Sequence, residues 1–151
     1  MTPNNRRIID ADGHVAEDAL AIIAHMPEAY REKARVQPFN PFPPFDHLHA
    51  AHLVDMPAGA FNRKVGPKEW LAFLDDVGIE STVLYPTAAL AIGLVQDPGW
   101  ASSIARAYNN WFHSRYSKKD SRLKGVAVLP IQDPQAAAAE LRYAVEKLDM
   151  V

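Results

Sequence analysis

An aspartate and a histidine stand two positions apart near the start of the chain, in the stretch Asp12-Gly13-His14. Side chains two positions apart on an extended chain point to the same side, so this carboxylate and this imidazole can converge. A carboxylate oxygen and an imidazole nitrogen together suit Zn²⁺, Mn²⁺ or Fe²⁺. The pattern predicts a divalent-metal site, and the alternative is that the two side chains cap a strand end without a metal.

Three apolar runs predict the strands that would position this pair. They cover residues 7–12, 81–87 and 125–131. The second and third runs are rich in β-branched residues and lack a polar alternation, which is typical of strands covered on both faces. We therefore expect three buried strands.

Two Asp-Pro pairs predict where helices begin, Asp97-Pro98 after the second run and Asp133-Pro134 after the third. Aspartate is a good N-cap, and proline at the first helical position loses only an N–H that has no partner there. Each predicted helix has an apolar face with spacings of three and four residues. These faces are Trp100, Ile104, Tyr108, Trp111 and Phe112 in the first helix, and Ala137, Leu141, Val145 and Leu148 in the second.

The order of the elements predicts a single α/β domain over residues 1–151. A helix from Pro67 to Gly78 precedes the second strand, and a further helix covers about 18–26. The proline-rich stretch 38–66 is interpreted as an insertion or lid within the domain. Alternating strands and helices predict a parallel sheet with right-handed crossovers.

Composition narrows the class of protein. Hydrophobic residues make up 48% of the 151 residues and charged residues 23%, as in globular proteins. Sixteen Lys and Arg against 18 Asp and Glu give a net charge of −2, which offers no electrostatic reason to expect nucleic acid or a membrane as partner. With no cysteine and a polar start without a secretory signal, we expect a cytoplasmic protein.

The stretch 8–17 resembles the first-strand signature of the amidohydrolase-2 family. This family contains metal-dependent hydrolases and decarboxylases related to aminocarboxymuconate-semialdehyde decarboxylase. The resemblance runs in order through nearly the whole chain and is weakest across 38–66. Its further motifs are 70–80, 83–87, 107–111 and 123–134.

The resemblance implies a TIM-type (β/α)8 barrel with one divalent metal ion at the carboxyl ends of the strands, Zn²⁺ before Mn²⁺ or Fe²⁺. Many members of the family offer two histidines on the first strand. Here Asp12 holds the first of these places, as in the decarboxylases with an acid there, and His14 holds the second. By this match both are metal ligands. Glu17 is a weaker candidate ligand or a residue supporting the ligands, and the alternative for Glu17 is a solvated acid starting a helix.

A second histidine cluster lies in the predicted insertion. It consists of His47, His49 and His52, of which the last two would be neighbours on a helix. If the insertion covers the mouth of a barrel, these histidines are candidates for contact with a polar substrate. A metal-binding role is the weaker interpretation.

The predicted function is a metal-dependent hydrolase or decarboxylase (carboxy-lyase) acting on small carboxylated or aromatic compounds. A barrel of this type needs at least roughly 200 residues, so we expect the remaining ligands and the late-strand Asp that serves as general acid/base to lie beyond Val151. No catalytic residue is then assigned within the chain. The alternative is a non-catalytic partial barrel that forms a homo-oligomer or pairs with a separate C-terminal half.

Overall fold

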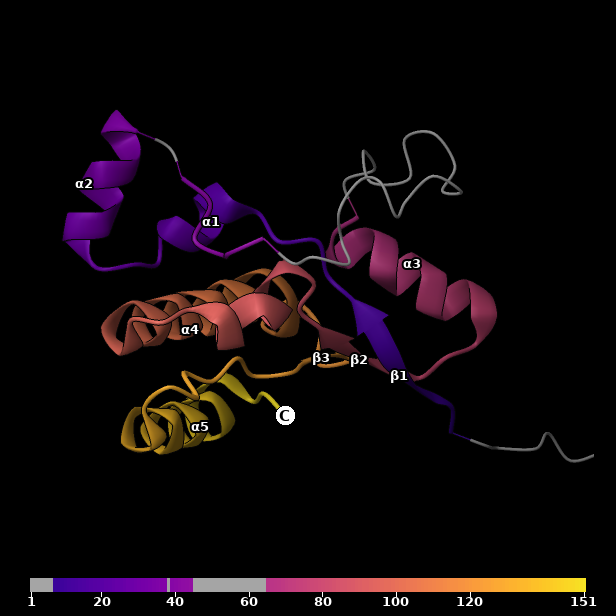
Figure 1. Cartoon of the computed structure of the whole chain (residues 1–151). Helices are drawn as coiled ribbons and strands as arrows, with labels where there is room; N and C mark the ends of the chain where they lie inside the picture. Colours follow the sequence, from indigo (N-terminus) through magenta and orange to yellow (C-terminus); the bar gives the residue numbers. More distant parts are fainter. Residues whose placement is uncertain (1–6, 38, 45–64) are drawn as a thin grey trace, which may run out of the picture.

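The computed structural model describes residues 7–37, 39–44 and 65–151, which form a small parallel sheet with helices (Figure 1). The strands are β1 (Ile9–His14), β2 (Ser81–Tyr85) and β3 (Leu123–Gly125), in the order β1-β2-β3. Both neighbouring pairs of strands are parallel. The prediction of a parallel α/β arrangement is therefore confirmed for this part of the chain.

Helices lie between the strands and after the last one. The α-helices are α1 (Ala19–Ile23), α2 (Glu28–Val36), α3 (Pro67–Val77), α4 (Pro98–Phe112) and α5 (Pro134–Leu148). A 3₁₀ helix, η3 (Ala88–Leu94), follows β2, and a short π-helical segment, η4 (His113–Ser117), extends α4. Among the described residues, no helix is long and apolar enough to cross a membrane.

The predicted helix starts and stops are confirmed where local chemistry decides them. The carboxylate of Asp97 accepts a hydrogen bond from the N–H of Trp100 at 2.6 Å, and α4 begins at the next residue. Asp133 caps α5 in the same way. Gly78 ends α3 with φ of 72°, a left-handed conformation that glycine adopts without a Cβ clash.

Several boundaries differ from the predictions. The first strand covers Ile9–His14 and not 7–12, and the second ends at Tyr85 and not at residue 87. The helix expected over about 18–26 ends at Ile23, and the next helix, α2, was not predicted. The third strand covers Leu123–Gly125 and not 125–131. Beyond Gly125 the N–H of Ala127 donates to the carbonyl of Val151 at 2.8 Å. The Asn109 side chain takes both backbone groups of Val128, donating to its carbonyl at 3.0 Å and accepting from its N–H at 2.9 Å, so these groups do not pair with β2.

One face of the sheet packs against helices. We call it the helix face and define it by Gly13, Thr82, Leu84, Leu123 and Gly125, which the strand register places side by side and which are all buried. A Cβ atom on Gly125 would lie 2.3 Å from the Phe112 ring. Glycine is required there because α4 approaches the strand too closely for any side chain.

The opposite face is accessible to solvent, and we call it the open face. Side chains of β2 alternate between buried and partly exposed, and Ile9 on β1 is 58% exposed. The predictions that the second and third strands are covered on both faces, and that the first strand is buried, are therefore wrong within the described residues. The open face consists of Ile9, His14, Ser81, Val83, Tyr85 and Lys124.

Helices α4 and α5 lie side by side and are joined by a buried polar cluster (Figure 1). Glu140, only 4% exposed, accepts from Asn109 at 2.8 Å and from Arg106 at 2.7 Å. These bonds draw Glu140 inward, so the buried face of α5 runs through Glu140, Ala144 and Leu148. The predicted apolar face was wrong for its two central residues, Leu141 and Val145, which are 44% and 50% exposed.

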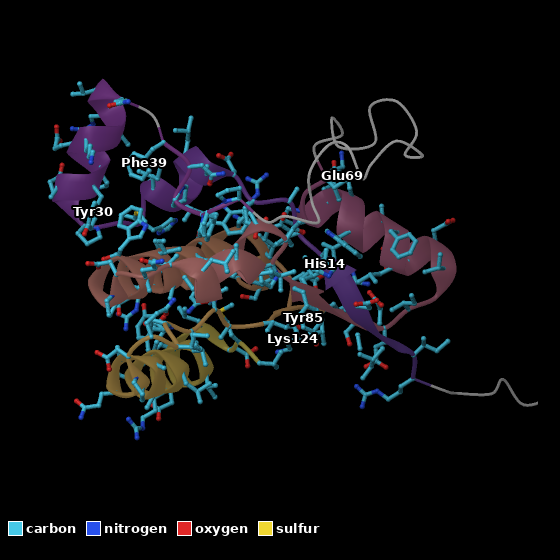
Figure 2. All side chains as sticks on the ribbon, in the orientation of Figure 1. His14, Tyr30, Phe39, Glu69, Tyr85 and Lys124 are labelled. Atoms are coloured by element: carbon cyan, nitrogen blue, oxygen red, sulfur yellow. The ribbon has the colours of Figure 1, made fainter. Side chains whose placement is uncertain are left out.

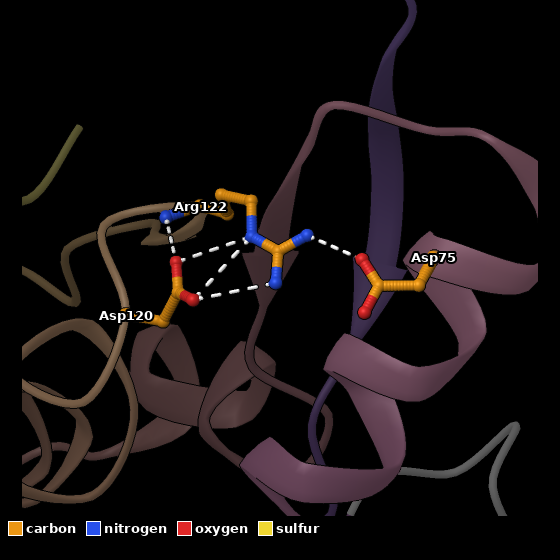
Figure 3. Close-up of polar contacts among 3 residues, drawn as sticks. All are labelled: Asp75, Asp120 and Arg122. Atoms are coloured by element: carbon orange, nitrogen blue, oxygen red, sulfur yellow. Dashed lines mark hydrogen bonds and ion pairs between the residues drawn. The ribbon is translucent and has the colours of Figure 1, made fainter.

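An ion-pair cluster lies before β3, toward the amino ends of the strands (Figure 3). Arg122 donates to Asp75 of α3 at 2.6 Å and contacts Asp120, whose carboxylate also accepts from the Arg122 N–H at 2.9 Å. That backbone hydrogen bond, with the guanidinium beside it, lowers the pKa of Asp120. The cluster ties α3 to the start of β3, at the end of the sheet away from His14.

Candidate active site

The carboxyl end of β1 contains a bulge that sets the direction of the predicted ligands. Asp10 pairs with Thr82 and Gly13 pairs with Leu84, so β1 holds one more residue than β2 over this interval. Asp10 is anchored by the hydroxyl of Thr82, which donates to its carboxylate at 2.7 Å. Asp12 and His14 follow on either side of Gly13.

Gly13 allows β1 to lie tightly against its neighbours. A Cβ atom there would lie 2.7 Å from the Leu84 side chain, 2.7 Å from the Thr82 hydroxyl and 3.1 Å from Trp70 of α3. Because Gly13 belongs to the helix face, the next residue, His14, belongs to the open face. Its side chain is exposed to solvent.

His14 lies beside the carboxyl end of β2 (Figure 2). It pairs with Tyr85 in the strand register, and the two ring centroids are 5.9 Å apart. Its Nδ1 lies 3.4 Å from the hydroxyl oxygen of Thr87, two residues further along. The ends of β1 and β2 thus bring an imidazole, a phenol and a hydroxyl together.

Glu17 accepts hydrogen bonds from the segment that follows β2, which consists of Thr87 and the start of η3. Its Oε1 accepts from the N–H groups of Thr87 and Ala89, both at 2.9 Å, and its Oε2 accepts from the N–H of Ala88 at 3.0 Å. Burial, and then the charge of Glu17, raise the pKa of the buried Tyr108 well above its usual value. The hydrogen bonds between Glu17 and these three amides were not predicted from the sequence, because nothing in the order of residues marks three backbone amides as partners of one carboxylate.

Asp12 and His14 supply two potential metal donors. Within the described ranges, no group of three or more His, Asp or Glu residues could hold a metal ion. The histidine cluster His47, His49 and His52 lies outside the described residues, as do residue 38 and residues 45–64 of the predicted insertion. The metal-ligand and substrate-contact assignments therefore stay predictions.

A separate hollow lies away from His14. An open groove of about 1140 Å³ runs between α1, α3 and the end of α4, with His25, Trp111 and Arg115 among its lining residues. Burial lowers the pKa of His25. None of the predicted ligands lines this groove, so the candidate site remains the strand ends around His14.

Comparison with known proteins identifies relatives of one kind. No family model matches the chain. It is 36% identical over 78 residues to the gamma-resorcylate decarboxylase of Polaromonas sp. (strain JS666) and 37% identical over 81 residues to that of Rhodococcus jostii (strain RHA1). These matches cover 52% and 54% of this chain and 24% of each relative. The chain thus matches about a quarter of the length of these decarboxylases.

Solved structures show the same fold over nearly the whole chain. A dihydroxybenzoic acid decarboxylase from Polaromonas sp. JS666, with bound manganese and the inhibitor 2-nitroresorcinol, superposes with a TM-score of 0.58 at 24% identity. The superposition covers 96% of this chain and 36% of that protein. An amidohydrolase from Mycobacterium avium subsp. paratuberculosis gives a TM-score of 0.62 at 19% identity, over 94% of this chain and 47% of the other. This chain has the fold of one part of these larger proteins.

Proposed function

We propose that this chain, a homologue of part of the gamma-resorcylate decarboxylases, carries the first part of a metal-dependent decarboxylase for small hydroxylated aromatic carboxylates. The sequence relation to these decarboxylases is the observation that carries the proposal. The position of His14 at the carboxyl end of a parallel strand supports it, because active sites of (β/α)8 barrels lie at that end.

The two faces of the sheet support a barrel as the complete architecture. In a (β/α)8 barrel, helices cover the outside of each strand and side chains from all strands fill the interior. The helix face corresponds to the outside and the open face to the interior. The remaining strands would then come from polypeptide outside the described residues, since the chain superposes on only 36% of the manganese-containing decarboxylase.

The donor chemistry of Asp12 and His14 fits a divalent ion. A carboxylate oxygen and an imidazole nitrogen are ligands that Mn²⁺, Zn²⁺ and Fe²⁺ accept, and the related decarboxylase structure contains manganese. In this proposal the other ligands lie outside the described residues. A bound divalent ion would act as a Lewis acid toward the carboxylate and adjacent hydroxyl of the substrate.

The residues of the chain itself would bind and orient. Asp12 would add negative charge that favours a cation, and His14 would direct one ring nitrogen to the site while Thr87 contacts the other at 3.4 Å. Tyr85 lies beside His14 on the open face, where an aromatic substrate could pack against its ring. The group that moves the proton is proposed to be an Asp on a later strand, outside this chain.

A hybrid enzyme tests the proposal. The chain would replace the segment that it matches in the Polaromonas gamma-resorcylate decarboxylase, and release of CO₂ from 2,6-dihydroxybenzoate would be measured with Mn²⁺ present. We expect turnover by the hybrid, at least 100-fold lower after His14→Ala and unchanged after Asp133→Asn, which alters only the cap of α5. A folded hybrid that turns over equally well without His14 would overturn the proposal.

The open face favours a second candidate, a partial barrel with no activity of its own. With two donors among the described residues, the isolated chain would bind metal weakly and lack a general acid. We expect no turnover of 2,6-dihydroxybenzoate by the purified chain, with or without Mn²⁺. Turnover by the purified chain that His14→Ala abolishes would exclude this candidate.

A further inference from the structure

We infer that Glu17 is a positioning residue that orients His14 through the loop after β2; the role of this orientation in metal binding rests on the proposed function. Glu17 contacts three consecutive backbone amides, and the first of them belongs to Thr87. The hydroxyl of that same residue contacts the His14 ring. Glu17 therefore acts on His14 through Thr87.

The carboxylate of Glu17 links the segments that follow two neighbouring strands. Glu17 lies three residues after the end of β1, and Thr87 lies two residues after the end of β2. Hydrogen bonds from N–H groups to a charged carboxylate are stronger than those between neutral groups. Three such bonds at 2.9–3.0 Å, in a half-buried position, hold the Thr87 backbone in one place relative to β1.

In this inference a fixed Thr87 backbone holds the Thr87 hydroxyl beside Nδ1 of His14. The hydroxyl then favours a proton on Nδ1 over a proton on Nε2. An imidazole that binds a metal through Nε2 must carry its proton on Nδ1, and an acceptor beside Nδ1 favours that tautomer. Among the described residues, Thr87 supplies the polar contact of the His14 ring, with 3.4 Å between Oγ1 and Nδ1. In the inferred arrangement the hydroxyl oxygen accepts from Nδ1–H and leaves Nε2 free.

The same geometry separates positioning from direct metal binding by Glu17. Two amides occupy Oε1 and one occupies Oε2, so three of about four acceptor positions of the carboxylate are used. A ligand role would leave the His14 tautomer independent of Glu17 in the metal-free chain. A positioning role makes the tautomer depend on it.

NMR of the ¹⁵N-labelled, metal-free chain tests the inference. The two ring nitrogens of His14 would be assigned by comparison with His14→Gln, at a pH where the ring is neutral. We expect the Nδ1–H tautomer to predominate in the wild type and the tautomer ratio to shift at least threefold toward Nε2–H in both Glu17→Gln and Thr87→Val. Thr87→Ser, which keeps the hydroxyl, would retain the wild-type ratio.

Asp133→Asn is the matched control, because Asp133 also accepts from backbone amides but lies at the start of α5. It should leave the His14 ratio unchanged. An unchanged ratio in folded Thr87→Val or in folded Glu17→Gln would overturn the inference, because each variant removes one link between Glu17 and His14.

A second measurement separates this inference from the proposed function. Mn²⁺ affinity, followed by the loss of the free-ion EPR signal, should fall about tenfold in Thr87→Val and stay constant in Asp133→Asn. A shifted tautomer with unchanged Mn²⁺ affinity would support the positioning role and overturn the metal site of the proposed function. An unshifted tautomer with lower affinity would do the reverse.

Discussion

The helix face and the open face of the sheet belong to the same three strands but differ in what completes them. On the helix face, Leu84 is fully buried and α4 approaches so closely that Gly125 has no room for a Cβ atom. On the open face, Val83 and Tyr85 stay partly exposed, and His14 is exposed. The packing that stabilises the described chain is therefore concentrated on one face, and His14, a predicted metal ligand, lies on the other.

The two faces also differ in how well their polar side chains are bound by other groups of the chain. The polar side chain of the helix face has its partner within the chain, since the hydroxyl of Thr82 donates to Asp10 at 2.7 Å. His14 has a long contact to Thr87 and no surrounding ligand cluster among the described residues. Substitutions on the two faces should consequently have different effects, on folding for one and on association and binding for the other.

The largest expected effect is on the association state. Exposed apolar side chains on the open face, such as Ile9, favour pairing with another chain. We expect light scattering at micromolar concentration to show a dimer or larger species, and Val83→Glu to raise its dissociation constant more than tenfold. Val145→Glu, on the exposed side of α5, is the control and should leave association unchanged. A stable wild-type monomer would show that the open face needs no cover.

The next effect compares two adjacent residues of β2. Leu84→Ala removes a side chain that is 0% exposed and should lower the free energy of unfolding by about 2–5 kcal/mol. Val83→Ala, on the open face, should cost less than about 1.5 kcal/mol, because its side chain is already partly hydrated. Urea denaturation of both variants measures the difference. Equal losses would contradict the distinction between the two faces.

A smaller loss is expected where the helix face has no space. In Gly125→Ala the new methyl group meets the Phe112 ring, and relieving the overlap should cost about 1–3 kcal/mol. The control is Gly93→Ala, whose Cβ would have an ordinary contact of 3.6 Å with Ile131. Thermal unfolding would show a lower midpoint for the first variant only; matching midpoints would mean that α4 moves away without penalty.

The smallest effect concerns pH and the ion-pair cluster of Arg122. The pKa of Asp120 is lowered by the Arg122 N–H and guanidinium, so ionised Asp120 stabilises the fold above its unfolded-state pKa of about 3.9. This stabilisation is lost as the pH falls through the lowered pKa. At neutral pH, Asp120→Asn should cost less than about 1 kcal/mol. The difference from the wild type in urea denaturation should vanish in acid, and a difference independent of pH would contradict this role.

The ends of several helices could be predicted from the sequence, because caps and helix-ending glycines act on backbone groups only a few residues away. The carboxylates of Asp97 and Asp133 cap α4 and α5, and Gly78 ends α3, as their positions predicted. The apolar runs predicted the order and parallel direction of the strands. By contrast, α2 was missed, because its mostly polar sequence buries little more than Ala34.

Contacts between distant residues decided what periodicity could not. The buried face of α5 depends on Glu140, whose partners Asn109 and Arg106 lie more than thirty residues earlier. After β3, the backbone groups of Val128 bind Asn109, nineteen residues earlier, and the N–H of Ala127 binds Val151. Apolar spacing favoured other outcomes in both cases, since it does not register a buried side chain that is hydrogen-bonded across the fold.

The position of the acid-glycine-histidine stretch at the end of a strand could be predicted from the order of residues alone. The side of the sheet on which His14 lies, and the contacts of Glu17, depend on how the chain folds. The bulge before Gly13 changes the alternation of side chains, and close packing at Gly13 directs His14 to the open face. Glu17, a candidate ligand by its place in the sequence, meets three amides that lie seventy residues away along the chain and are brought to it by strand pairing. Such contacts form only when folding brings distant segments together, and local sequence patterns do not show which segments will meet.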